Sequence, residues 1–514
     1  MKQSFKTMLP VFLGASALCY SSVCASAEQG ISKAEIHKSV EKLRQIRDPL
    51  NSKKKLLPLN TIGKIVTSPC LNSLVYLVEQ YADPKDDKTR KALTTVNQHF
   101  QELPPGYCDG TDPCPNPWPS KNATMLVVKM IDVFTKWCTF LPDINGSHDN
   151  GLYYIQEFAW FYYRNQAGQD FVQGRDPNNP GNKLLTGLKF TKDFSVQRGE
   201  FMWSKASAEK VPEWVYDPRI EISDYQLNPD NTYQYRSFNE FFARQIKTDP
   251  TTQTIPSRPA TMPLSEYPER DYIVVSPTDC IMNPLVQVLQ NKDGSVNREY
   301  IQNPLQEDMV LDVKNIPISL MDMLGNASDD LKQKFVGGTG LSCVLMPNTY
   351  HHFHSPVNGT VKHAEIVPTG LYGYEDFPNW APLDGNVGRP GTDFSQFQMF
   401  QHGVIIVEVK YKGLNGETLT GYVASIPVGL NTIGSVVLDD DIVPGKKVKR
   451  GYTRFGNFYY GGSLNILLFS KGLASGVVQT RLGTQITLFN VGTPPADPNL
   501  PTVRKFPIKG VATQ

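Results

Sequence analysis

The chain has 514 residues, 40% of them apolar and 20% charged, a composition typical of a folded globular protein rather than a disordered one. Its 51 basic and 50 acidic residues leave a formal net charge of +1, so nothing global indicates a nucleic-acid partner. A chain of this length is too long for one ordinary core, and we expect two domains.

The first 27 residues have the pattern of a secretory signal peptide. Lys2 and Lys6 form a positive n-region, residues 8–23 are mostly apolar or small, and Ala25-Ser26-Ala27 is an A-x-A cleavage signal. We therefore expect removal of residues 1–27 and export to a periplasm, a secretory lumen or the cell exterior. A membrane anchor is the alternative, and the shortness of the apolar run disfavours it.

Six cysteines remain after this leader, an even number that permits disulfides in an exported protein. Cys108 and Cys114 flank a loop rich in Gly, Asp and Pro, and they are the best pair by sequence. No CxxC motif occurs, so a zinc or thioredoxin-like site has no support.

Residues 28–225 are predicted to form a mainly helical N-terminal extension without chemistry of its own. Apolar residues recur at helical spacing in four segments, namely 31–57, 68–82, 123–141 and 152–165. The aromatic stretch 153–163 is expected to lie in the core rather than on a membrane-contact or partner surface.

Residues 226–514 are predicted to form a β-rich domain, which makes the fold class α+β. Short alternating runs bounded by Gly, Pro, Asn and Asp predict strands over 272–275, 403–411, 418–425 and 464–469. One helix is expected among them, over 317–334.

Three of the eight histidines, His351, His352 and His354, fall within four positions. Histidine titrates near neutral pH, which suits proton transfer. Alternation along a strand would place His352 and His354 on one face. Surface histidines beside a loop are one alternative. A metal site is another, although the nearby His363 and Glu365 fit no known metal-ligand spacing, and we expect no metal.

Two other segments could supply the partners of a histidine base. Asp279 ends a strand-like run in SPTDC, and Ser463 follows two glycines in Gly461-Gly462-Ser463. Taken alone, two glycines before a strand mark a tight bend or a close backbone approach. Together, Asp, His and Ser are the parts of an activated nucleophile, in which Asp orients His and His takes the Ser proton.

These segments, in this order, resemble the phosphatidylserine decarboxylase family. The blocks that carry the resemblance are SFNEFFARQ (237–245) with Arg258-Pro259, SPTDC, YHHFHSPVNG, residues 424–435, and GYTRFG, GGS and LLFSKG around the proposed processing site. The match spans about residues 237–473, and its specificity lies in the order of the blocks rather than in any one motif.

The resemblance implies a triad of Asp279, His354 and Ser463 that cuts the chain between Gly462 and Ser463. Ser463 would become a covalent pyruvoyl cofactor on a short α chain, and the β chain would end at Gly462. His351 matches the family's second histidine, which is expected to contact substrate or assist proton transfer.

The resemblance further implies that a Schiff base with the pyruvoyl group converts phosphatidylserine to phosphatidylethanolamine and CO2, with exposed aromatic residues contacting the membrane peripherally. One alternative is a pyruvoyl-dependent decarboxylase of a free, aromatic amino acid. Another is a non-catalytic or metal-binding β-domain that uses the histidine cluster. Cys280 and Leu464 replace the family's usual Gly and Thr, and residues 368–396 read as an insertion, so the substrate stays open.

Overall fold

The structure of the protein is a computed structural model. It describes residues 58–102, 106–107, 113–114, 118–141, 161, 165–217, 220–227, 233–258, 273–291, 296–301, 304–313, 316–345, 348–367, 402–413, 415–429, 435–459 and 463–474, with Lys38 and Glu41. Several predictions concern residues outside the described ranges. They are the expected leader over 1–27, almost all of the expected helices over 31–57 and 152–165, the expected pairing of Cys108 with Cys114, the expected insertion over 368–396, and the expected cleavage at Gly462. The division of the chain at residue 225 stays a prediction.

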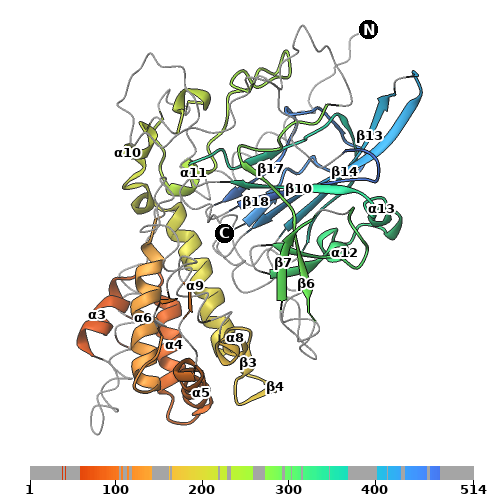
Figure 1. The fold of residues 1–514 in the computed structure, drawn as a ribbon. Helices are drawn as coiled ribbons and strands as arrows, with labels where there is room; N and C mark the ends of the chain where they lie inside the picture. Colours follow the sequence, from red (N-terminus) through yellow and green to blue (C-terminus); the bar gives the residue numbers. More distant parts are fainter. Residues whose placement is uncertain are drawn as a thin grey trace, which may run out of the picture.

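The N-terminal part is helical, as predicted (Figure 1). Its helices are α3 (Leu59–Thr67), α4 (Leu71–Ala82), α5 (Lys88–Glu102), α6 (Ala123–Thr139), α8 (Gln166–Val172) and α9 (Thr186–Trp203). Two small hairpins join them, β1 (Gly106–Tyr107) with β2 (Pro113–Cys114) and β3 (Arg175–Asp176) with β4 (Asn179–Lys183). The predicted helices over 68–82 and 123–141 correspond to α4 and α6.

Apolar faces and caps explain this helical unit. In α6 the Asn122 side chain accepts a hydrogen bond from the backbone amide of Met125, which satisfies a donor that the first turn leaves unpaired. Aromatic side chains of α6 and α9 meet edge to face, for example Phe134 and Phe194 with ring centroids 4.8 Å apart. A disulfide between Cys70 and Cys138 ties α4 to α6.

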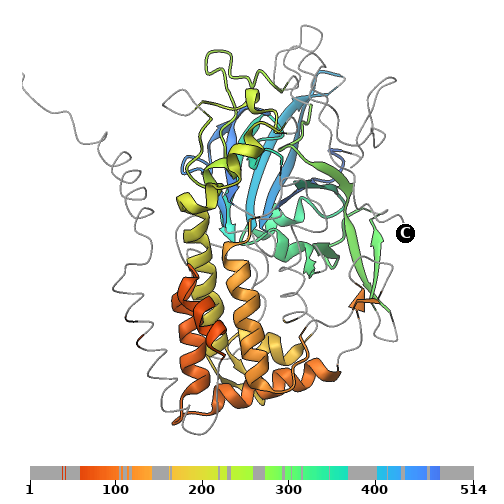
Figure 2. The same ribbon diagram turned by 90° about the vertical axis from the view of Figure 1, so that its left-hand side faces the viewer.

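Helix α9 connects the helical unit to the β-rich part. It packs on α4, α6 and α8, and its C-terminal residues Phe201 and Met202 enter the core that the sheets share. Figures 1 and 2 show it running from the helical unit toward α11. Short helices follow it, namely η1 (Lys205–Ala208), α10 (Val211–Val215), η2 (Ile222–Asp224) and α11 (Phe238–Phe242).

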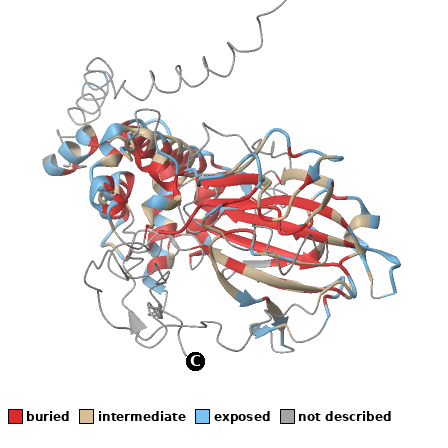
Figure 3. Ribbon diagram, turned by 90° about the horizontal axis from the view of Figure 1, so that it is seen from above, coloured by how far each residue is buried: buried red, intermediate tan, exposed pale blue. Residues whose placement is uncertain are grey.

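The β-rich part contains a seven-stranded antiparallel sheet in the order β16-β12-β13-β14-β18-β10-β5. Its strands are β5 (Ile281–Pro284), β10 (Thr339–Leu345), β12 (Gly359–Val367), β13 (His402–Lys412), β14 (Thr418–Gly429), β16 (Lys447–Val448) and β18 (Ser463–Phe469). The middle strands are buried on both faces, and Figure 3 shows their ribbons almost wholly buried. The predicted strands 403–411, 418–425 and 464–469 correspond to β13, β14 and β18.

Two smaller sheets complete this part. One has the order β11-β17-β15, with β11 (His352–His354), β17 (Arg454–Tyr459) and β15 (Ser435–Leu438). The other has the order β7-β6-β8-β9, with β6 (Val286–Gln290), β7 (Val296–Tyr300), β8 (Val310–Val313) and β9 (Ile316–Ser319). Helices α12 (Leu320–Met323) and α13 (Asp329–Gln333) follow β9. The α+β fold class is thus confirmed.

Two local predictions are wrong. The helix expected over 317–334 is a strand followed by two short helices, because Ser319 and Ser328 each cap a new helix and Gly325 between them has a positive φ of 58°. The described part of the run 272–275 belongs to no strand; its backbone bonds the Pro356 loop through the amide of Val275 instead.

Within the described residues, no helix is both long enough and apolar enough to cross a bilayer.

Candidate active site

Ser463 opens β18, in the interior of the seven-stranded sheet. It pairs with Leu345 of β10 on one side and with Gly429 of β14 on the other, and its side chain is fully buried. The Ser463 hydroxyl has no hydrogen-bond partner among the described residues. A buried hydroxyl without a partner is unfavourable in a purely structural position, which marks Ser463 as a candidate for chemistry.

His351 lies in the segment between β10 and β11 and is fully buried. Its Nδ1 is 2.9 Å from the carbonyl oxygen of Thr349, so Nδ1 carries the proton and Nε2 carries a free lone pair. That Nε2 has no partner among the described side chains and backbone groups. Burial, and to a smaller extent the nearby Arg244 charge, lower the pKa of His351 to about 3. His351 is therefore a neutral base at pH 7.

The block FFARQ holds this histidine segment in place. Phe242 stacks on the His351 ring with centroids 3.7 Å apart. The Arg244 guanidinium donates to the carbonyl oxygens of Asn348 at 2.7 Å and Thr349 at 3.2 Å. One arginine that follows α11 thus satisfies two backbone carbonyls next to His351.

His354 ends β11 and is also buried. Its Nδ1 is 3.2 Å from the carbonyl oxygen of Tyr452, and its Nε2 is 3.0 Å from the hydroxyl of Tyr350. Because the carbonyl must accept, Nδ1 donates and Nε2 accepts from the tyrosine. Burial lowers the pKa of His354 to about 4. His354 is thus also neutral at pH 7, with its acceptor nitrogen engaged by Tyr350.

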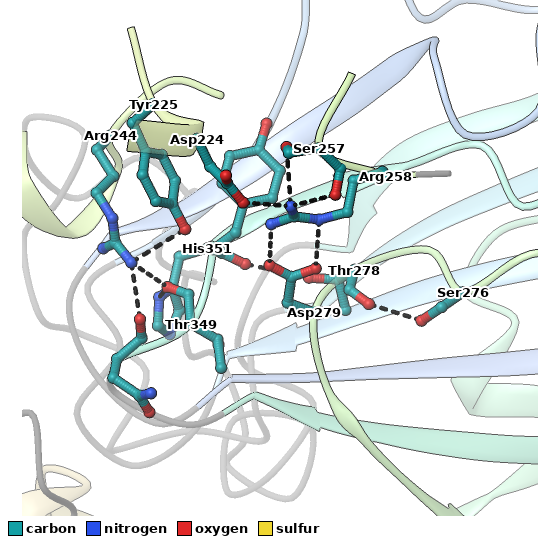
Figure 4. Close-up of polar contacts among 12 residues, drawn as sticks. Asp224, Tyr225, Arg244, Ser257, Arg258, Ser276, Thr278, Asp279, Thr349 and His351 are labelled. Atoms are coloured by element: carbon teal, nitrogen blue, oxygen red, sulfur yellow. Dashed lines mark hydrogen bonds and ion pairs between the residues drawn. The ribbon is translucent and has the colours of Figure 1, made fainter. Parts of the chain in front are cut away.

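Asp279 forms a two-armed ion pair with Arg258 (Figure 4). Arg258 Nε is 3.0 Å from Asp279 Oδ1, and Nη2 is 2.7 Å from Oδ2. The third arm of the same guanidinium, Nη1, donates to Asp224 at 2.8 Å. The two carboxylates raise the pKa of Arg258 above its usual range against the opposing effect of its burial. Arg258 therefore fixes the Asp279 carboxylate in both position and charge.

The expected contact from Asp279 to His354 is not a direct hydrogen bond, because the ring nitrogens of His354 bond Tyr350 and Tyr452. The Asp279 charge nevertheless acts on His354 by raising its pKa, against the larger effect of burial. The segment that holds Asp279 also bonds the histidine segment, because the Thr278 hydroxyl donates to the Tyr350 carbonyl oxygen at 3.2 Å. The catalytic roles of Asp279, His354, His351 and Ser463 stay predictions.

The structure tests the interpretation of the cluster as surface histidines. All three histidines are at most 5% exposed, so the interpretation as surface histidines is wrong. His352 is occupied structurally: its Nε2 donates to the Ala243 carbonyl oxygen at 3.0 Å. His363 lies on β12, outside the cluster, with its Nε2 3.0 Å from Glu365 Oε1. Among the described residues, no three potential metal ligands gather.

Sequence reasoning assigned no role to Arg258, Tyr350 or Arg244, although all three lie inside the quoted motif blocks. It also passed over Asn465, two residues after Ser463, whose buried amide nitrogen lacks a described partner. Cys343 lies opposite Met282 of β5, and its thiol interacts with that of Cys280, which raises the Cys343 pKa. Both cysteines are free thiols.

A family model and two of the three relatives described here name the same family. The family model for phosphatidylserine decarboxylase matches residues 238–487. A phosphatidylserine decarboxylase proenzyme of Clostridium perfringens is 27% identical over 334 residues, covering 63% of this chain and 92% of the relative. Phosphatidylserine decarboxylase proenzyme 2 of rice, Oryza sativa subsp. japonica, is 25% identical over 56% of this chain and 38% of its own length. A protein of Amanita muscaria named decarboxylase iboD is 26% identical over 51% of this chain and 67% of its own length.

Proposed function

We propose that this chain, as a member of the phosphatidylserine decarboxylase family, is a self-processing carboxy-lyase that converts phosphatidylserine to phosphatidylethanolamine and CO2. The observation that carries the proposal is the buried Ser463 hydroxyl without a described partner, within the region that the family model matches. We also propose export, which the signal-like pattern of residues 1–27 supports, and peripheral contact with the membrane that holds the lipid.

Ser463 fits the site of a pyruvoyl group, since it is a buried serine whose hydroxyl has no described partner to hold it as a structural residue. A pyruvoyl group at this position would supply a carbonyl that captures a substrate amine and accepts the electron pair released with CO2. The burial of β18 would exclude water from that carbonyl.

Processing starts with the serine oxygen. Ser463 Oγ attacks the carbonyl carbon of Gly462, and its proton goes to a histidine base. The histidine then gives this proton to the nitrogen of residue 463 as the peptide C–N bond breaks, which leaves an ester and a free amine. Loss of the α-proton of residue 463 then expels the β chain as a carboxylate ending at Gly462. Water finally releases the nitrogen of residue 463 as ammonia, which leaves the carbonyl of the pyruvoyl group on the α chain.

The protonation and hydrogen bonds of the predicted partner residues support these proton transfers. His354 is neutral and carries its proton on Nδ1, so its Nε2 can take the serine proton after exchanging the Tyr350 hydroxyl for Ser463. Asp279, held by Arg258, stabilises the positive charge that His354 then carries. His351 keeps an unengaged lone pair on Nε2, which suits proton transfer during turnover.

Intact-mass analysis of purified protein tests the proposal. We expect two chains, the smaller covering residues 463–514 and blocked to N-terminal sequencing, whereas Ser463→Ala and His354→Ala should both stay uncut. If the wild-type protein, like Ser463→Ala, gives the mass of a single uncut chain, the pyruvoyl chemistry is refuted. Normal cutting in His354→Ala would remove only His354 from the processing role.

A second candidate function keeps the chemistry and changes the substrate to a free aromatic amino acid. The relative named decarboxylase iboD supports this second candidate, because its name specifies a decarboxylase and no phospholipid. Release of CO2 from phosphatidylserine vesicles, compared with release from free serine, tryptophan and tyrosine, separates the two functions. Turnover of the vesicles alone supports the lipid assignment, and turnover of a free amino acid alone overturns it.

A further inference from the structure

Cys280 and Cys343 are free thiols that meet across the edge of the seven-stranded sheet. Cys280 directly precedes β5, and Cys343 lies on β10, opposite Met282 of β5. Because Cys280 lies two residues before Met282, strand alternation places it on the same face as Cys343 and diagonal to it. The two side chains are within reach of each other, since their thiols share a hydrogen bond.

The Ser276 hydroxyl completes this pair of thiols. It donates to the Thr278 carbonyl oxygen at 2.6 Å, a bond drawn in Figure 4, and its oxygen lies 3.6 Å from the Cys280 sulfur. Because the hydroxyl proton is engaged by Thr278, the Ser276 oxygen accepts from the Cys280 thiol. The Cys280 sulfur is then the acceptor of its bond with Cys343, so the two sulfur atoms face each other.

The two thiols differ in their access to solvent. Cys280 is partly exposed, whereas Cys343 is fully buried. The hydrogen bond with Cys280, followed by burial, raises the pKa of the Cys343 thiol. Of the two, Cys280 is therefore the thiol that can attack a reagent from solution, and Cys343 can react with a group that is already attached to Cys280.

We propose that this pair is a modification site, at which a disulfide of another molecule oxidises Cys280 and Cys343 to a disulfide within the chain. The Cys280 sulfur attacks one sulfur of that molecule, and the other sulfur leaves as a thiol with the Cys280 proton. Cys343 then attacks the Cys280 sulfur of the mixed disulfide, and the second thiol leaves with the Cys343 proton. Two thiols of the chain are oxidised and one external disulfide is reduced to two thiols, so atoms and electrons balance.

The helical unit of the same chain supports an oxidising setting. It contains the disulfide between Cys70 and Cys138, and such bonds form and persist in oxidising compartments. A compartment that maintains this disulfide also exposes Cys280 to disulfide reagents.

The new bond would lie beside the candidate active site. Cys280 directly follows Asp279, whose carboxylate Arg258 holds at 2.7 Å. Strand β10, which carries Cys343, pairs with the strand that begins at Ser463. Oxidation would therefore fasten the segment that holds Asp279 to the strand next to Ser463.

Peptide mapping of the folded protein tests the proposal. Purified wild-type protein is incubated with oxidised glutathione, its remaining thiols are blocked with N-ethylmaleimide, and it is then digested with trypsin. Trypsin places Cys280 on a peptide of residues 271–292 and Cys343 on a peptide of residues 335–362, so their bond joins two peptides. We expect this joined pair to form, and dithiothreitol should separate it.

Two variants test the order of the two steps. In Cys343→Ala, Cys280 should keep one glutathione, because no second thiol displaces it. In Cys280→Ser, Cys343 should take up no glutathione, because it is buried. Ser342→Ala is the matched control, since Ser342 precedes Cys343 on the opposite face of β10, and it should give the joined pair as the wild type does.

Two results on the wild-type protein would overturn the proposal, and neither depends on how a variant folds. One is glutathione that stays on Cys280 without a bond to Cys343, and the other is no reaction of either cysteine. Both cysteines precede Ser463, so the joined pair should also form in Ser463→Ala. Failure of this inference thus leaves the proposed function standing, and an uncut wild-type chain leaves this inference standing.

Discussion

The buried histidines make the stability of the β-rich part depend on pH in the neutral range. His351, His352 and His354 are all neutral in the folded chain, because burial lowers the pKa of each one. For His351 the folded value falls to about 3, and for His354 it falls to about 4. Nearby arginines add to the effect: Arg244 acts on His351, and Arg454 acts on the other two.

The sign follows from proton binding. An unfolded histidine titrates near pH 6.5, so below that pH the unfolded chain takes up a proton that the folded chain refuses. The free energy of unfolding is therefore highest above about pH 7 with respect to these rings. It falls as the pH drops through 6.5 and continues to fall until the folded pKa is reached. Between pH 7.5 and 5.5 each ring should cost about 1.4 kcal/mol, or about 4 kcal/mol for all three.

Urea unfolding at pH 7.5, 6.5 and 5.5 measures this loss. The Ser463→Ala chain is the suitable background, because it should remain a single uncut chain. His352→Gln is the matched control: it removes one titrating ring outside the proposed chemistry and should reduce the pH-dependent loss by about a third. A free energy of unfolding that is constant across this range would refute the reasoning, since it would mean that the folded state protonates these rings as readily as the unfolded state.

Two further predictions concern the ion pair and the disulfide. Arg258→Met should lower the free energy of unfolding by about 3 kcal/mol, because it leaves the partly buried Asp279 and Asp224 without the Arg258 charge. Arg258→Lys should have an intermediate effect, because lysine cannot donate two parallel hydrogen bonds to one carboxylate. Urea unfolding measures both variants, and an unchanged midpoint for Arg258→Met would contradict the prediction. Cys138→Ala removes the bond to Cys70, which closes a loop over 68 residues, and should cost about 4 kcal/mol in the helical unit. Self-cleavage of that variant should keep the wild-type rate, and slower cutting would show that the helical unit supports the site.

Local pattern was enough to predict part of the fold. Helix α6 follows from apolar residues at helical spacing, and β13, β14 and β18 follow from short apolar runs between turn residues. Most residues of these elements are buried, so the pattern of apolar residues in each segment determines whether it forms a helix or a strand. The helix expected over 317–334 failed because two serine caps and Gly325 divide it, and capping depends on a few hydrogen bonds rather than on periodicity.

The order of the motif blocks also predicted which residues to consider for chemistry, and it named Asp279, His351, His354 and Ser463. The distances and hydrogen bonds among these residues could not be predicted from the sequence, because each block packs against another block that is distant in the chain. Arg244 reaches the Asn348 carbonyl oxygen across 104 residues of chain, and Arg258 meets Asp279 across 21.

The sequence by itself therefore determined the residue types of the candidate site and the strand on which Ser463 lies. The tertiary structure decided which groups of that site are protonated and which lack a hydrogen-bond partner among the described residues. It shows which histidine nitrogen holds a proton, which carboxylate is paired with an arginine, and that the buried Asn465 amide nitrogen has no described acceptor. The physical reason is that burial and hydrogen-bond partners set these properties, and segments far apart in the chain supply both.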